Sequence, residues 1–201
     1  MATQPKPYIS LEEYFELERA SVDRHEYLNG QVFAMAGGTA AHSIISLNIT
    51  GELRGQLRGR DCTAYNGDMR IRTSPSGLYT YADAVVACGD SQVEQDTLVN
   101  PVVIVEVLSK RTENYDRGKK FARYRRIPSF REYLLVAQTS VYIEHHIREY
   151  GSRPVWTMTE YSDLQDTIYL STIDVALRLT DVYEKVSFPA KKKKEITNEL
   201  R

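Results

Sequence analysis

Apolar residues recur along the chain in two patterns, one typical of helices and one typical of strands. Ser10 precedes LEEYFELE, and Glu13 stands three residues after it, which is the capping-box signature of a helix start. The segment 41–59 carries a second helical pattern. Its apolar positions are Ile44, Ile45, Ile49, Leu53 and Leu57. This pattern predicts an amphipathic helix that ends near Gly59.

Runs of β-branched and aromatic residues predict strands in most of the remaining chain. Residues 24–36 are typical of a hairpin that turns at Asn29-Gly30. Further strands are expected at 62–72, 81–88, 101–108 and 131–137, with a helix from about Asp116 to Ile127 before the last of these. The segments 141–150, 154–161 and 166–171 predict an antiparallel extension of the same sheet.

Two carboxylates stand inside otherwise apolar strands. Asp83 lies in the sequence YADAVVAC and Glu106 lies in PVVIVEVL. The polar stretch from Gly89 to Asn100 separates them, which predicts an antiparallel hairpin. Residues that face each other across a hairpin have a constant sum of residue numbers, and a loop centred on this stretch gives a sum of 189. Asp83 and Glu106 have that sum, so we expect them to be cross-strand neighbours.

Such a pair of carboxylates indicates a cation site. Opposed residues in a ladder have Cβ atoms about 4.5–5.5 Å apart, and two negative charges held this close destabilise a fold unless a cation or a shared proton lies between them. A hard divalent ion satisfies both carboxylates. The alternative is that one of them caps a strand end or pairs with an arginine.

The predicted helix after Glu106 offers a third chemical group. At 100° per residue, Phe121, Tyr124 and Ile127 define an apolar arc that also contains Lys120 and Arg117, while Lys119, Arg123 and Arg126 fall on the opposite side. A lysine in a face that packs on a sheet must reach solvent or meet negative charge. We therefore expect Lys120, and not Lys119, to lie near the carboxylates, with a structural ion pair as the alternative.

Composition sets broad limits on the class of protein. The chain has 201 residues, of which 42% are hydrophobic and 26% are charged, and this is ordinary for a globular protein. The length predicts one domain over residues 1–190, followed by a charged tail at 191–201. Four consecutive lysines open that tail, which we interpret as a solvated terminus, with a nucleic-acid contact as the alternative.

Basic residues concentrate between Ser109 and Arg131. Nine Lys or Arg residues in this segment stand against two acids, although the formal net charge of the whole chain is only -1. The segment could face a polyanion such as nucleic acid. The alternative is a solvated helix surface, which the charge count alone does not exclude.

The cysteines and the apolar runs bear on location. Cys62 and Cys88 stand in strand-like segments without metal-ligand spacing, and we expect buried free thiols in a reducing cytoplasm. The longest apolar run, from Val102 to Leu108, is short and interrupted by Glu106. Neither a membrane span nor a signal peptide is expected, and the predicted location is cytoplasmic.

The histidines are weaker candidates. His42, near the start of the long predicted helix, could approach the carboxylates, but a lone histidine is more often a capping or structural residue. His145 and His146 stand next to each other on an alternating strand and must point to opposite faces.

Several short motifs in this order resemble one family. The order helix, three strands, helix, strand, with Asp83 on the second strand and Glu106 on the third, resembles the PD-(D/E)XK nuclease superfamily. More closely, nearly the whole chain resembles the Uma-type family of bacterial restriction endonuclease-like proteins (DUF820). The matching residues are Glu26-Tyr27 with Gly30, Tyr81-Ala82-Asp83, Glu106-Val107-Leu108-Ser109 with Thr112, and Asp116-Arg117 with Lys120 and Tyr124.

This resemblance implies a fold and a chemistry. The fold is an α/β (α+β) restriction-endonuclease-like core, with a mixed central sheet flanked by helices and an antiparallel extension. The implied activity is Mg²⁺-dependent hydrolysis of phosphodiester bonds, most simply in DNA, with Mn²⁺ as a substitute. Asp83, Glu106 and the Val107 carbonyl would hold the ion, Lys120 would support the reacting charge, and Glu26 would complete the site. A homodimer is also implied.

Two positions depart from the family pattern. Ala82 replaces the usual proline before the aspartate, and Leu108 replaces the superfamily lysine that follows the glutamate by two residues. In the Uma-type pattern the lysine has moved to the helix, where Lys120 stands. The competing hypothesis is a catalytically silent nuclease-fold module that binds nucleic acid or a protein partner, and a substrate other than DNA is a further alternative.

Overall fold

A mixed six-stranded sheet forms the centre of the computed structural model, which describes residues 7–35, 37–151 and 153–188. Its strands lie in the order β12-β11-β10-β9-β6-β3. Their bounds are β3 (Cys62–Asn66), β6 (Ala84–Cys88), β9 (Val103–Leu108), β10 (Glu132–Ala137), β11 (Ile143–Glu149) and β12 (Val155–Tyr161). The pair β9 and β10 is parallel and the other pairs are antiparallel. The mixed sheet and its flanking helices confirm the predicted fold class.

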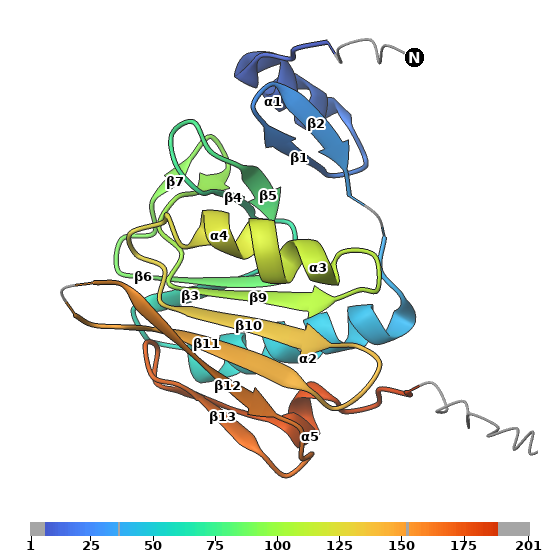
Figure 1. The fold of residues 1–201 in the computed structure, drawn as a ribbon, viewed down its shortest axis with the longest axis vertical. Coiled ribbons are helices and arrows are strands. Elements are labelled where there is room, and N and C mark those ends of the chain that lie inside the picture. The colour runs from blue at the N-terminus through green and yellow to red at the C-terminus, as the bar shows by residue number, and fades with distance from the viewer. Residues whose placement is uncertain (1–6, 36, 152, 189–201) are drawn as a thin grey trace, which may run out of the picture.

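Helices cover both faces of this sheet (Figure 1). On one face lies α2 (Ala40–Gln56), whose buried Ile45, Ile49 and Leu53 pack on the strands as the spacing predicted. On the other face lies a continuous helical segment made of α3 (Glu113–Tyr115), the π-helical turn η1 (Asp116–Lys120) and α4 (Phe121–Tyr124). This segment connects the parallel strands β9 and β10.

The N-terminal unit sits above one end of the sheet (Figure 1). It comprises α1 (Leu11–Ala20), opened by the predicted capping box of Ser10 and Glu13, and the hairpin of β1 (His25–Leu28) and β2 (Gln31–Ala34). Asn29 and Gly30 have φ of 50° and 76°, the left-handed values that a tight hairpin turn requires. This hairpin is part of a second six-stranded sheet, in the order β2-β1-β5-β4-β8-β7, in which β1 pairs with β5 (Tyr79–Tyr81).

The second sheet corrects one predicted strand. Residues 62–72 do not form one strand, because the chain turns after Asn66 and enters the other sheet as β4 (Arg70–Arg72). That sheet also contains β5 (Tyr79–Tyr81), β7 (Val93–Glu94) and β8 (Thr97–Leu98). The last two strands form a small hairpin inside the segment that was expected to be a loop.

The predicted antiparallel extension is right for two strands and wrong for the third. β11 and β12 continue the central sheet, but β13 (Thr167–Leu170) leaves it and pairs with β14 (Val175–Arg178) in a separate two-stranded sheet. This hairpin and the following α5 (Leu179–Val182) bury apolar residues in the same core as α2. None of the helices in the described part of the chain is long and apolar enough to cross a membrane. The predicted tail, 191–201, lies outside the described residues.

The cysteines correct a second prediction. Cys62 and Cys88 are not free thiols but form a disulfide. They are cross-strand partners in the ladder of β3 and β6, a pairing that brings their Cα atoms to 3.9 Å. Each cysteine looked isolated in the sequence because 26 residues separate them, and only the strand pairing brings them together. The free-thiol argument for a cytoplasmic location therefore no longer holds.

Candidate active site

The strand pairing brings the two predicted carboxylates together. In the antiparallel ladder of β6 and β9, Ala84 faces Val105 and Val85 faces Ile104, which confirms the predicted register. Asp83 lies directly before β6, outside the paired residues, and its backbone N–H donates to the Val105 carbonyl at 3.1 Å, next to Glu106. Glu106 shares the alternation of Ile104 and Leu108, which pack toward the α3, η1 and α4 segment.

Asp83 is held by contacts to both carboxylate oxygens. The backbone N–H of Val107 donates to Oδ2 at 2.7 Å. His42 Nε2 lies 3.3 Å from Oδ1. This contact with Asp83 raises the pKa of His42 above its ordinary value, although burial opposes the shift.

Lys120 lies at the centre of the site. Its Nζ is 2.8 Å from Glu106 Oε1, 3.4 Å from Glu26 Oε1 and 3.9 Å from Asp116 Oδ1. It also donates to the carbonyl of Tyr81 at 3.1 Å. Burial alone would lower the pKa of Lys120, but the surrounding carboxylates outweigh that effect and hold this pKa well above its ordinary value.

Of the two carboxylates predicted to bind metal, that of Glu106 is the more buried. Its side chain is 7% exposed, whereas that of Asp83 is 20% exposed. The hydroxyl of Tyr124 donates to Oε1 at 2.8 Å, the same oxygen that Lys120 contacts. Burial raises the pKa of Glu106 to about 8, even though the ammonium of Lys120 opposes that shift. Removing water from this carboxylate therefore favours a proton or a cation beside it.

Glu26 enters the site from the N-terminal hairpin. It is buried on β1 and contacts three side chains from three different parts of the chain. Thr80 of β5 donates to Oε1, the hydroxyl of Tyr115 donates to Oε2 at 3.0 Å, and Lys120 lies near Oε1. Thr80 and Tyr115 were not predicted from the sequence, because neither lies in an unusual pattern and both reach Glu26 only through tertiary packing.

The helical segment separates Lys120 from its neighbour as predicted. The side chain of Lys120 is 4% exposed, whereas Lys119 is exposed. Arg117 lies between these extremes and binds Glu144 at 2.8 Å and Glu113 at 3.1 Å instead of entering the site. Asp116 is buried beside Lys120, and burial raises the pKa of the Asp116 carboxyl. The π-helical turn thus buries the first and last of its five residues, Asp116 and Lys120.

Acidic side chains outnumber basic ones in the site. Glu106, Glu26 and Asp116 surround the ammonium of Lys120, and Asp83 lies close enough to Glu106 to help raise the pKa of that carboxyl. Within the described residues, no group of three or more His, Cys, Asp or Glu side chains is arranged to hold a metal ion. A site with two carboxylates and one carbonyl does not require such a group, since Mg²⁺ commonly keeps several waters and uses one or two protein carboxylates. The donor set therefore fits a hard, oxygen-ligated cation.

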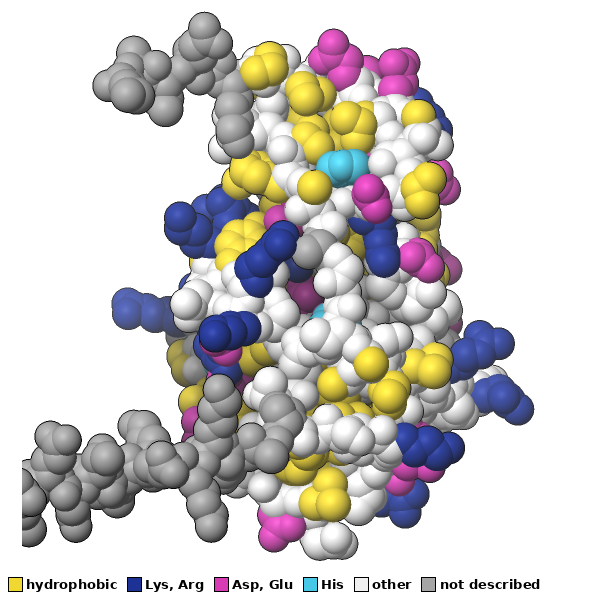
Figure 2. Space-filling model, turned by 90° about the vertical axis from the view of Figure 1, so that its right-hand side faces the viewer, with side chains coloured by type: hydrophobic (Ala, Val, Ile, Leu, Met, Phe, Trp, Pro, Cys, Tyr) yellow, Lys and Arg dark blue, Asp and Glu magenta, His cyan; other side chains and the backbone are white. Residues whose placement is uncertain are grey.

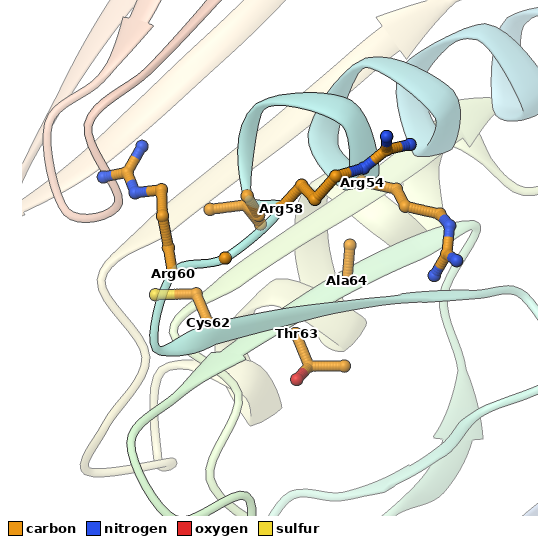
Figure 3. A pocket seen from close by; sticks show the side chains of 8 residues that line it. Arg54, Arg58, Arg60, Cys62, Thr63 and Ala64 are labelled. Atoms are coloured by element: carbon orange, nitrogen blue, oxygen red, sulfur yellow. The ribbon is translucent and has the colours of Figure 1, made fainter.

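The surface view places an acidic hollow beside basic groups. Figure 2 shows a hollow near the middle of one face, with an acidic and a histidine side chain at its floor and Lys or Arg side chains next to it. A separate pocket of about 240 Å³ lies at the other end of α2, where Arg54, Arg58 and Arg60 surround Cys62 (Figure 3). Arg60 there donates to the carbonyls of Ile173 and Asp174. None of the residues that line this pocket belongs to the carboxylate site.

The fold and the site together define the class of protein. The mixed sheet with helices on both faces is that of restriction-endonuclease-like α+β proteins. The Uma2 family model, described as "Putative restriction endonuclease", matches residues 11–180. The chain therefore belongs to the Uma2 family.

Individual relatives agree with this assignment. The chain is similar to "Uncharacterized protein slr1290" of Synechocystis sp. (strain ATCC 27184 / PCC 6803 / Kazusa), with 35% identity over 92% of this chain and 96% of the relative. A second protein of that organism, sll1609, is 31% identical over 74% of this chain and 84% of its own length. A crystal structure of "a putative nuclease belonging to DUF820" from Anabaena variabilis ATCC 29413 superposes with a TM-score of 0.70 at 15% identity, covering 87% of this chain and 97% of that one. At this identity the superposition shows the shared fold.

Proposed function

We propose that this protein is a metal-dependent endonuclease that hydrolyses phosphodiester bonds, most simply in DNA. One observation carries the proposal: the Asp83 carboxylate accepts the backbone N–H of Val107, the residue after Glu106, and Lys120 lies 2.8 Å from Glu106. Family membership and the DUF820 neighbour support nuclease chemistry. Metal dependence and the choice of DNA are the parts of the proposal that rest on the chemistry of the site.

The side chains suggest a division of labour. Asp83 and Glu106, with the carbonyl of Val107, would hold Mg²⁺ or Mn²⁺ through oxygen atoms. When bound, such an ion lowers the pKa of water and neutralises charge on a phosphate that is being attacked. Lys120 would place its ammonium against the developing negative charge, and Glu26 and Asp116 hold that ammonium in position. Tyr124 fixes the orientation of Glu106 through its hydroxyl.

The surroundings of the site suit a polyanion. The segment 109–131 is basic in sequence, but the structure divides its charges into internal and external ones. Lys120 is buried and Arg117 is paired with two glutamates, whereas Lys119 and Arg126 are exposed. The exposed members would contact phosphates on either side of the scissile bond.

A nicking assay tests this proposal. Supercoiled plasmid should be converted to open-circular or linear DNA in the presence of Mg²⁺ or Mn²⁺ and not in the presence of a chelator. Asp83→Asn should abolish the conversion, since it removes the charge that binds the ion while keeping the size of the side chain. Metal-independent cleavage, or equal cleavage by wild type and Asp83→Asn, contradicts the proposal.

The second candidate is a catalytically silent nuclease-fold module that binds nucleic acid or a protein partner. One observation favours it: the ammonium of Lys120 is buried and fully engaged with Glu106, Glu26 and Tyr81, as in a structural ion pair. Leu108 also occupies the position where the wider superfamily has its lysine. This candidate predicts binding without turnover under every metal condition.

A further inference from the structure

We propose that His42 is a positioning residue of the carboxylate site, which orients Asp83 before a cation binds. This inference rests on the proposed function, because it concerns the same site. Sequence reasoning favoured a capping or structural role for His42. The structure instead directs its imidazole at Asp83, with Nε2 at 3.3 Å from Oδ1.

The contact completes the fixation of the Asp83 carboxylate. Oδ2 already accepts a hydrogen bond from the backbone of Val107 at 2.7 Å. The imidazole, with Nε2 3.3 Å from Oδ1, is a second contact that opposes rotation of the carboxylate. A carboxylate oxygen has two lone pairs, so this contact leaves Oδ1 able to bind a cation. Hydrogen-bond partners of metal ligands typically change metal affinity by about 10- to 100-fold.

The start of α2 is built to hold the imidazole in this place. Thr39 caps the helix by accepting the backbone N–H of His42 at 3.2 Å. The hydroxyl of Thr39 also donates to Gln138, whose side-chain amide donates to the carbonyl of Leu108 at 2.7 Å. The helix start is therefore tied to the end of β9, the strand that supplies Glu106 and Val107.

Gly38 makes room for the ring. A Cβ at this position would lie 2.7 Å from Nδ1 and 2.8 Å from Cγ of His42, well inside van der Waals contact. The backbone of Gly38 is not in the left-handed region, so an alanine there is tolerated by the backbone and is opposed by the imidazole. The glycine thus marks a position where space is reserved for the ring.

The exposure of His42 distinguishes it from a core histidine. The side chains of His42 and Asp83 are 21% and 20% exposed, so this pair lies at the open end of the site. By contrast, the pair His145 and Glu132 in the core is 1% and 0% exposed. A histidine with a purely structural role in the core would be expected to contact a buried group, as His145 does, and not a carboxylate that solvent can reach.

The contact between His42 and Asp83 is tested without metal. We expect the long-range ¹H–¹⁵N spectrum of the metal-free protein to show a protonated Nε2 for His42, and Asp83→Asn to shift the ring resonances of His42. The resonances of His25, which binds Glu18 at 2.8 Å in the N-terminal unit, serve as the reference and should not move. Ring resonances of His42 that are the same in wild type and Asp83→Asn overturn the proposal.

The consequence for the site is tested by Mn²⁺ affinity, measured by electron paramagnetic resonance of the free ion. His42→Ala should weaken Mn²⁺ binding by about 10- to 100-fold, and His42→Gln, which keeps an N–H donor, should recover part of the loss. Gly38→Ala should also weaken binding because it displaces the ring, while His25→Ala should match wild type. Circular dichroism verifies the fold of each variant.

The outcomes separate this inference from the proposed function. Unchanged Mn²⁺ affinity in folded His42→Ala, together with lost affinity in Asp83→Asn, overturns the role of His42 and leaves the metal site intact. Absence of Mn²⁺ binding by the wild type contradicts the proposed metal site and, with it, the role of His42 toward a cation. The spectrum of the metal-free protein then still decides whether His42 holds Asp83.

Discussion

At the scale of single residues, the burial of Lys120 explains more of the site than any other feature. A buried ammonium requires negative charge around it, and here Glu106, Glu26 and Asp116 supply that charge. The adjacent Lys119 makes none of these contacts and is exposed. Two neighbouring lysines therefore form a natural matched pair for testing which of them serves the reaction.

We predict that Lys120→Ala abolishes nuclease activity while Lys119→Ala behaves like wild type. Removing a positioned group that stabilises charge in a transition state costs about 10²–10³ in rate, whereas removing an exposed lysine costs almost nothing. Cleavage rates measured at saturating metal give the comparison. Lys120→Ala should still bind metal, because ammonium is not a ligand. Equal rates in the two variants favour the silent module.

The residues of the site were predictable to different degrees. The sum of residue numbers identified the register of β6 and β9, which carries Ala84 opposite Val105, although the segment between these strands enters the second sheet instead of forming a simple loop. The helical arc identified Lys120, although a π-helical turn departs from the 100° step assumed for it. Thr80 and Tyr115 were not predictable, since they meet Glu26 only after the N-terminal hairpin docks on the rest of the chain.

At the scale of elements, the pairing between strands determines to which sheet each strand belongs, and the sequence pattern does not predict that pairing. The pattern identified the strands of the central sheet but missed β5, β7, β8 and β14, and it did not assign strands to sheets. β4 and β13 have strand-like composition, and yet one joins the second sheet and the other forms a hairpin with β14. The disulfide between β3 and β6 was missed for the same reason. Partner choice depends on contacts distant in sequence, which local periodicity does not encode.

The disulfide should stabilise the fold in a measurable way. Cys62 and Cys88 close a loop with a sequence separation of 26 residues, and the chain-entropy model gives such a loop about 3–4 kcal/mol of stabilisation. We predict that Cys62→Ser/Cys88→Ser, or reduction of wild type, lowers the free energy of unfolding in urea by about this amount. The reductant should have no effect on the double variant. Equal stability of oxidised and reduced wild type contradicts the structural role.

The buried carboxylate of Glu132 joins the β13–β14 hairpin to the central sheet. Glu132 on β10 accepts hydrogen bonds from His145 at 2.6 Å and from the backbone of Thr172 at 2.6 Å. Burial alone would raise the pKa of Glu132, but these hydrogen bonds outweigh it and the pKa is lowered. A lowered carboxyl pKa means that the stabilisation is present above the unfolded pKa, about 4.5, and is lost as the pH falls toward the folded value.

We therefore predict that Glu132→Gln destabilises the protein at pH 7 by about 1.5–3 kcal/mol, the usual contribution of hydrogen bonds to a charged group. The difference between variant and wild type should shrink as the pH falls below about 4.5, where the Glu132 carboxyl of the unfolded wild type takes up a proton while that of the folded state is still ionised. Urea unfolding at a series of pH values provides the test. A difference that stays constant down to pH 3 would show that the charge of Glu132 is not involved.

At the scale of the whole molecule, the distribution of charge determines which partner fits. The site is acidic inside and bordered by basic groups outside, an arrangement that suits a phosphate backbone approaching a bound cation. The charge count in the sequence overstated the external part, since Lys120 and Arg117 turned out to be engaged internally. The exposed members of the segment, including Lys119 and Arg126, remain available for phosphates.

Nucleic-acid affinity should accordingly depend on salt. We predict that the affinity for duplex DNA falls steeply with salt concentration and that Arg123→Glu/Arg126→Glu flattens that dependence. Arg19→Glu on α1 makes the same kind of charge change away from the site and should have little effect. Fluorescence anisotropy at several salt concentrations measures the slope. Binding that does not depend on ionic strength points instead to a protein partner.

The assembly state is a further proposal at this scale. Cleavage of both strands of a duplex requires two sites, which a homodimer supplies. Light scattering of the purified protein should therefore give about twice the chain mass of 23.0 kDa. A monomer under the conditions of cleavage would limit the enzyme to nicking one strand at a time.

The central claim, that Asp83 and Glu106 form a metal site, is tested most directly by thermal unfolding with and without Mg²⁺ or Mn²⁺. An ion that binds only the folded state stabilises it by about 2.7 kcal/mol at a concentration 100 times its Kd, so the Tm of the wild type should rise. Asp83→Asn and Glu106→Gln should remain folded and lose that rise. Equal metal-induced shifts in wild type and both variants would contradict the site.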